Sequence, residues 1–99
     1  MCNNYILDEN GNPKLETDVM AWARWFETAN RVIKETKVDE SEVSTVFLGL
    51  DYNFADKGLP LLYETMVFGG RLNGECNRYP TQEMAEIGHE EMVIKCKKK

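Results

Sequence analysis

The sequence has few of the residues from which metal and catalytic centres are usually built. Its 99 residues include one histidine, His89, and three cysteines, Cys2, Cys76 and Cys96. It contains no HExxH, CxxC, Walker-type phosphate loop or dinucleotide glycine fingerprint. A zinc site would need the three cysteines and His89 to converge, and their spacing lacks the short intervals of zinc fingers. We therefore expect neither a cofactor nor a metal.

Long hydrophobic runs are also missing. No apolar stretch approaches the roughly 20 residues that a transmembrane helix needs. The first residues, MCNNYILDENG, have no basic start and no long apolar region, so they do not predict a signal peptide. An odd number of widely spaced cysteines argues against a disulfide framework and for reduced thiols. These absences favour a cytoplasmic protein without a membrane partner.

The charge is unevenly distributed along the chain. Four of the 12 basic residues stand at positions 95, 97, 98 and 99, so residues 1–94 carry 8 basic against 17 acidic residues, a net charge of −9. Nucleic-acid phosphate repels so acidic a body, and direct nucleic-acid binding is not expected. We interpret residues 1–94 as one domain and residues 95–99 as a basic, solubilising tail, although such a tail could also contact phosphate or an acidic membrane.

The apolar, β-branched segments predict an antiparallel sheet. Residues 43–50 have apolar side chains on both faces and predict a central strand, and residues 61–68 predict its neighbour. Asn73-Gly74 is a strong hairpin signal before a strand at residues 75–79. Residues 31–38 alternate charged and β-branched side chains, as edge strands do. A short strand at residues 5–7 completes the predicted set.

Two segments have the pattern of helices. Residues 15–30 follow helical spacing, with Thr17 or Asp18 as a cap and an apolar face that we expect on the sheet. Residues from 82 to about 91 follow Thr81, and Met84, Ile87 and Met92 give them a modest apolar face. The predicted fold is therefore α+β, an antiparallel sheet of about four to five strands with two helices packed on it.

The acidic and aromatic residues after the central strand are the first candidates for binding. Asp51, Tyr52 and Phe54 lie just past residues 43–50, where a rigid strand can position ligand contacts. An ordinary Asx turn at Asp51 is the simpler interpretation. The aromatic rings could cap the core or offer a stacking surface.

Glu64 lies on one strand face with Met66 and Phe68. A carboxylate among apolar neighbours needs a partner or shifts its pKa. If this face is the core, Glu64 pairs with Arg71 or Arg78, or acts as a functional acid. If the alternate residues Tyr63, Thr65 and Val67 form the core face instead, the Glu64 carboxylate is solvated.

Arg71 and Arg78 flank the hairpin. Two guanidinium groups there could hold a small anionic ligand, such as a nucleotide, with Tyr52 or Tyr79 stacking on its base. Surface salt bridges to the many acidic residues are the simpler interpretation.

His89 and Trp25 complete the candidates. His89 lies near the border of the last helix's apolar face, where a hydrogen-bonded structural histidine is the ordinary interpretation. Trp25 points away from the apolar stripe of the first helix, so it could anchor a partner or cover the end of the core.

Four runs of residues carry a resemblance. The runs VSTVFLGLD (43–51), ETMVFGG (64–70), RYPT (78–81) and AEIGH (85–89) resemble a group of small proteins encoded by bacteriophages and prophages. The resemblance spans about residues 22–89, and the segment 52–60 is less typical. It implies an accessory role in an infected bacterial cytoplasm. That group has no assigned activity, so the resemblance assigns no functional residue.

The favoured function is binding. The partner would be a host or phage protein or a sequestered nucleotide-like ligand, and inhibition of a defence factor is one form of such an activity. A structural or assembly role in the phage is the first alternative. A small hydrolase that uses Glu64, Asp51 and His89 is the second. The open edge of the predicted sheet would also allow a homodimer.

Overall fold

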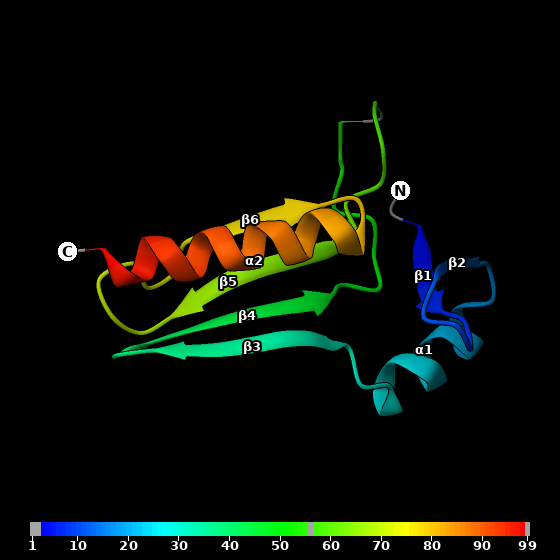
Figure 1. Cartoon of the computed structure of the whole chain (residues 1–99). Coiled ribbons are helices and arrows are strands. Elements are labelled where there is room, and N and C mark those ends of the chain that lie inside the picture. Colours follow the sequence, from blue (N-terminus) through cyan, green and yellow to red (C-terminus); the bar gives the residue numbers. More distant parts are fainter. Residues whose placement is uncertain (1–2, 56, 99) are drawn as a thin grey trace.

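Two antiparallel sheets and two helices make up the chain. The computed structural model describes residues 3–55 and 57–98, and Cys2 and the last tail lysine lie outside them. The elements in order are β1 (Asn4–Leu7), β2 (Pro13–Glu16), α1 (Val19–Thr28), β3 (Val32–Val38), β4 (Ser41–Phe47), β5 (Tyr63–Phe68), β6 (Cys76–Tyr79) and α2 (Gln82–Lys97) (Figure 1). One sheet pairs β1 with β2, and the other has the order β3-β4-β5-β6. The predicted α+β class is confirmed.

The four-stranded sheet has one buried face. Its strands follow one another as neighbours, with β4 and β5 in the centre and β3 at an edge, as predicted. Alternate side chains of β4 and β5 point to the same face and are buried there. These core-face residues are Val43, Thr45, Phe47, Tyr63, Thr65 and Val67.

The opposite face of this sheet has no described helix packed on it, and we call it the open face. Cross-strand pairing places the following residues there: Val32, Glu35, Lys37, Glu42, Ser44, Val46, Glu64, Met66, Phe68, Cys76 and Arg78. None of these side chains is fully buried. The sheet is therefore covered on one side only.

Helix α2 covers the core face (Figure 1). Thr81 caps it by accepting a hydrogen bond from the Met84 backbone, as predicted. Its buried stripe is Ala85, Gly88, His89, Met92 and Val93. The expected apolar face was wrong in two positions, because Met84 and Ile87 are exposed. The expected end at residue 91 was also wrong, since the helix continues to Lys97 and takes in part of the basic tail.

Glycine at position 88 allows α2 to approach the sheet closely. A Cβ atom there would lie 2.1 Å from the hydroxyl oxygen of Tyr79 on β6. Tyr79 is one of the partly buried side chains that pack on the core cluster of Phe47 and Tyr63. Its ring therefore occupies the space that a larger residue 88 would need.

Helix α1 belongs to the β1–β2 hairpin. It begins at Val19 instead of residue 15 because Pro13–Glu16 form β2, and Asp18 caps it. None of its residues is fully buried, and it contacts β1 and β2. Most of its apolar face therefore lies on this hairpin instead of the main sheet, which α1 contacts where Trp25 packs against Phe47. It reaches the end of that sheet through Trp22, whose Nε1 donates hydrogen bonds to the carbonyl oxygens of Tyr5 and Gly49, at 3.2 and 3.0 Å.

The close contact at residue 88 gives a stability prediction. Gly88→Ala should lower the free energy of unfolding by about 1–3 kcal/mol, because overpacking outweighs the gain in helix propensity of about 1 kcal/mol. Urea unfolding measures this difference. Ile87→Ala, at the exposed neighbouring position, should change the stability by less than about 0.5 kcal/mol. A Gly88→Ala protein as stable as the wild type would contradict the packing described.

Candidate functional site

His89 lies at the centre of a polar cluster between α2 and the sheet. Its ring is fully buried. Nδ1 is hydrogen-bonded to Oγ1 of Thr45 at 2.7 Å, and Nε2 to Oγ1 of Thr36 at 2.8 Å. Thr45 is in turn hydrogen-bonded to Oγ1 of Thr65 at 2.6 Å. A neutral imidazole has one donor and one acceptor nitrogen, and hydroxyls take either role, so the cluster is satisfied without a charge.

This environment identifies His89 as a structural residue. Burial lowers the pKa of His89 because the charged ring would lose its hydration. Glu64 projects from the opposite face of the sheet, since it alternates with the buried Thr65. The sheet therefore separates Glu64 from His89, and the predicted hydrolase set of Glu64, Asp51 and His89 does not form one pocket.

Three of the predicted candidates do meet at one end of the open face. Nε of Arg78 donates a hydrogen bond to the Glu64 carboxylate at 2.9 Å. The Arg78 guanidinium also stacks over the ring of Tyr52, 4.7 Å from its centroid. The alternative in which Glu64 lies on the core face is thus excluded, and its pairing with Arg78 is found. This cluster joins the open face to the segment after β4.

That segment projects from the body of the protein (Figure 1), and we call residues 51–55 and 57–61 the protruding loop. Asp51 closes its base by accepting hydrogen bonds from the backbone N–H groups of Asn53 and Leu61, at 2.8 and 3.0 Å. Nδ2 of Asn53 donates to the carbonyl oxygens of Lys57 and Leu59 at 2.6 and 2.9 Å. Asp51 therefore acts as a turn residue, and the loop has an internal frame.

The protruding loop displays apolar side chains to solvent. Phe54 is 69% exposed and Leu59 is 65% exposed, the highest values among the large apolar side chains of the described residues. The rings of Tyr52 and Phe54 lie 5.9 Å apart. Sequence reasoning missed Leu59, although an apolar residue between Gly58 and Pro60 in a predicted loop was an available signal.

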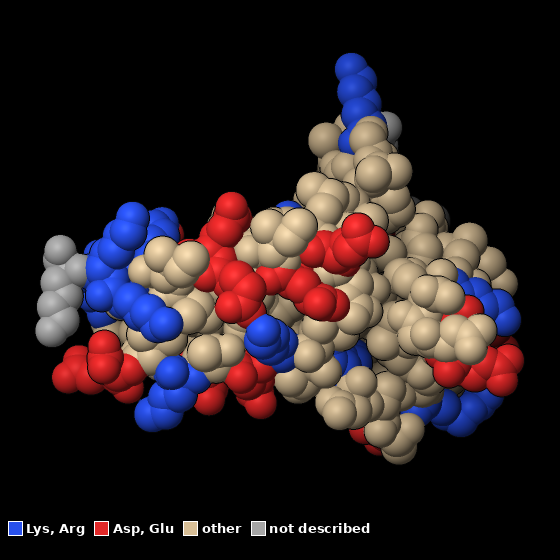
Figure 2. All heavy atoms as spheres, viewed as in Figure 1, with Lys and Arg blue, Asp and Glu red and all other residues tan. Residues whose placement is uncertain are grey.

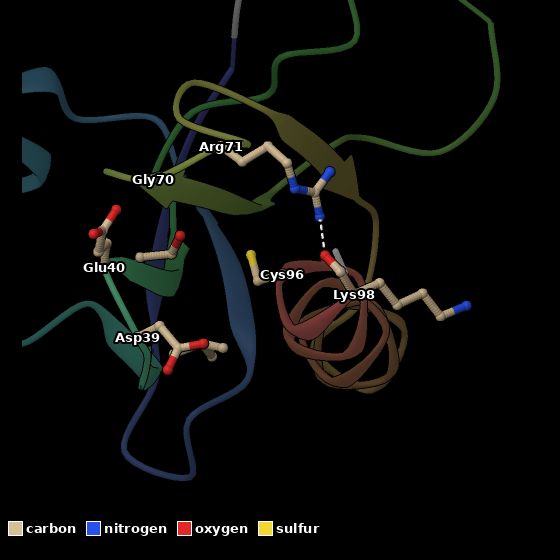
Figure 3. A pocket seen from close by; sticks show the side chains of 8 residues that line it. Asp39, Glu40, Gly70, Arg71, Cys96 and Lys98 are labelled. Atoms are coloured by element: carbon tan, nitrogen blue, oxygen red, sulfur yellow. Dashed lines mark hydrogen bonds between the residues drawn. The ribbon is translucent and has the colours of Figure 1, made fainter.

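Arg71 lies at the other end of the sheet. Its guanidinium donates hydrogen bonds to the carbonyl oxygens of Lys95 and Lys98, so it caps the C-terminus of α2. Figure 3 shows it above a cleft of about 400 Å³. The cleft is lined by Val38, Asp39, Glu40, Ser41, Gly70, Arg71, Cys96 and Lys98. The structure does not bring Arg71 and Arg78 together, because Arg71 contacts the C-terminal end of α2 while Arg78 is paired with Glu64 at the other end of the sheet.

Two aromatic candidates serve the core. Tyr79 points to the helix face of the sheet, against Gly88, and not toward Arg78 and Tyr52. Trp25 is half-buried and packs edge-on against Phe47, with the ring centroids 5.9 Å apart. Of the two interpretations of Trp25, the structure therefore supports the one in which it covers the end of the core.

Charged side chains of one sign gather at a few places along α2 and on the protruding loop. Figure 2 shows acidic side chains over the middle of α2, and basic side chains at its C-terminal end and at the far end of the protruding loop. Glu83 lies in the first turn of α2, and Lys95 and Lys97 lie in the last, which suits the helix dipole. Lys95 also forms an ion pair with Glu75.

Comparisons of the chain with protein-family models, with curated proteins and with solved structures found no match. Neither described helix has an apolar stretch long enough to span a bilayer. Within residues 3–55 and 57–98, no three His, Cys, Asp or Glu side chains are grouped so that they could hold a metal ion. Cys76 and Cys96 are free thiols. The surface geometry therefore carries the functional argument.

The buried histidine predicts a specific pH dependence. Its pKa is lower in the folded than in the unfolded chain, so the unfolded chain binds more protons. The stability that neutral His89 contributes is complete above about pH 6.5 and decreases as the pH falls toward its folded pKa. Urea unfolding of the wild type and of His89→Gln, from neutral to mildly acidic pH, should show a shallower loss for the variant. Parallel losses in the two proteins would be inconsistent with a neutral buried ring.

The frame of the protruding loop makes a second prediction. Asp51→Ala leaves two backbone N–H groups without their acceptor, at a cost of about 1–2 kcal/mol. Hydrogen exchange should accelerate in residues 52–61 and stay slow in β4 and β5. Asp51→Asn keeps an acceptor oxygen and serves as the control, with near-native exchange. Unchanged protection of the loop in Asp51→Ala would show that other contacts hold it.

Proposed function

We propose that this chain is a small accessory protein of the phage type that acts by binding a protein partner through the protruding loop. The supporting observation is the exposure of Phe54 and Leu59 on a loop with its own hydrogen-bonded frame. The resemblance to phage and prophage proteins favours a partner in a bacterial cytoplasm. Inhibition of a host defence factor is one effect that such binding would have.

The chemistry of the loop suits a protein surface. Aromatic and large apolar side chains that enter a partner's pockets carry much of the energy of protein interfaces. Phe54 and Leu59 provide two such anchors, and Lys57 adds a positive charge to a body that is otherwise acidic. We expect the partner to offer an apolar groove that takes these two side chains.

The frame of the loop favours tight binding. Ordering a flexible loop on association costs conformational entropy, which reduces the affinity. Here the side chain of Asn53 bridges the two sides of the loop, and the Asp51 carboxylate closes its base. Arg78 further holds the Tyr52 ring against the sheet. Phe54 and Leu59 are therefore presented by a segment that loses little conformational entropy when it binds a partner.

The arrangement gives less support to a small anionic ligand. The two arginines that would hold it lie apart, and Arg78 is already paired with Glu64. Tyr79, the alternative stacking residue, is packed against α2. A nucleotide would therefore meet no prepared site among these residues, whereas a protein would meet exposed apolar anchors.

Capture from bacterial lysates tests the proposal. The tagged protein, incubated with lysates of phage-infected and uninfected cells, should retain a defined protein. The double variant Phe54→Ser/Leu59→Ser should lose it, with an affinity reduced about 30-fold or more, because anchors of this kind contribute about 2 kcal/mol or more. Both side chains are largely exposed, so the variant should fold normally.

The matched control is Val19→Ser/Met20→Ser on α1. Its side chains are 62% and 63% exposed, so it removes a similar apolar area away from the loop. It should capture the partner as the wild type does. Retention by the loop variant, loss in both variants, or capture of nucleotides without any protein would each count against the proposal.

A further inference from the structure

The open face carries several apolar side chains that are exposed or half-buried. Phe68 is 51% exposed and Val32 is 44% exposed, and Val46 and Met66 between them are half-buried. Val32 lies directly opposite Val46, and Met66 directly opposite Cys76. Antiparallel sheets often leave one face to water, but that face is then mainly polar. Here the apolar residues form a diagonal band across the four strands, although Glu64, Ser44 and Glu42 lie directly opposite Val46, Met66 and Phe68.

The charges on this face include both signs, and some of them lie opposite one another. Lys37 lies directly opposite Glu42 in the register of β3 and β4. Arg78 is hydrogen-bonded to Glu64 at the other end of the face. With Glu35 at the edge, the open face holds three acidic and two basic residues, a net charge of −1, against −5 for the whole chain. A net charge this small leaves only weak repulsion between two copies of this face.

The chain also exposes more surface than its mass predicts. Its accessible surface is 6616 Å², whereas a folded chain of 11.4 kDa is expected to expose about 5,800 Å². Its radius of gyration is 14.3 Å, against about 12.6 Å for a compact domain of this length. The excess of about 800 Å² equals the area that each partner buries in a protein interface of standard size.

We propose that the open face binds the open face of a second copy of this chain, which gives a two-fold symmetric dimer. Such a contact is self-complementary: the apolar band of one copy packs on the same band of the other, as two sheets do in a sandwich. It does not rest on the proposed function, because it uses the apolar band of the sheet and neither Phe54 nor Leu59, although Tyr52 of the protruding loop contacts Arg78 at one end of the face.

The mass in solution tests the dimer. Sedimentation equilibrium from low to high micromolar concentration should show a species of twice the 11.4 kDa chain mass. Phe68→Glu places a charge in the apolar band and should raise the dissociation constant about tenfold or more. Ile94→Glu is the matched control, because Ile94 is 55% exposed on α2 and the change in charge is the same. It should leave the dimer intact.

Thiol reactivity identifies the face in the wild-type protein. Cys76 is exposed on the open face, whereas Cys96 is half-buried beside the cleft at the end of α2. Alkylation of Cys76, mapped by mass spectrometry, should slow as the dimer forms, while that of Cys96 should not change. Three results would overturn the inference. The protein could be a monomer at every concentration, or Cys76 could react as fast in the dimer as in the monomer. The dimer could also survive Phe68→Glu, which would indicate that the copies pair through the β3 edge.

Discussion

The cluster around His89 is the constraint on which the rest of the structure depends. The neutral His89 ring on α2 is hydrogen-bonded to the hydroxyls of Thr36 on β3 and Thr45 on β4. The Thr45 hydroxyl is hydrogen-bonded in turn to that of Thr65 on β5. A rotation of α2, or a shift of one turn, would leave these buried groups without partners at about 1–3 kcal/mol each. Hydrophobic contact alone does not fix a helix along a sheet, because it has no direction. The polar cluster therefore sets the position of α2, and Gly88 allows the close approach that it requires.

This use of the single histidine influences what kind of function the fold can support. The residue best suited to proton transfer near neutral pH is sealed inside, and the acid most suggestive in the sequence, Glu64, lies across the sheet and is paired with Arg78. Exposed apolar side chains lie on the protruding loop and on the open face. The two proposed contacts use different residues, Phe54 and Leu59 in the loop and Phe68 on the sheet.

The strands were predictable from the sequence because their signals are local: apolar alternation in β4 and β5, and charged alternation in β3. The roles of His89, Arg71 and Tyr79 were not, since each depends on a partner far along the chain. The apolar face of α2 illustrates the limit. Helical periodicity favoured Met84 and Ile87 as buried residues. The residues that pack on the sheet instead include the two smallest, Ala85 and Gly88, which do not stand out by their hydropathy. The AEIGH run is thereby explained as a packing pattern between helix and sheet.

The order of the elements has a consequence for folding. All four strands of the main sheet precede α2 in the chain, and each strand pairs with its neighbour in sequence. Pairings of this local kind can form early in folding, because little chain entropy is lost in closing their loops. The face that contains Phe47, Tyr63 and Val67 is covered only when α2 docks on it. Closure of the core and burial of His89 are therefore a single event.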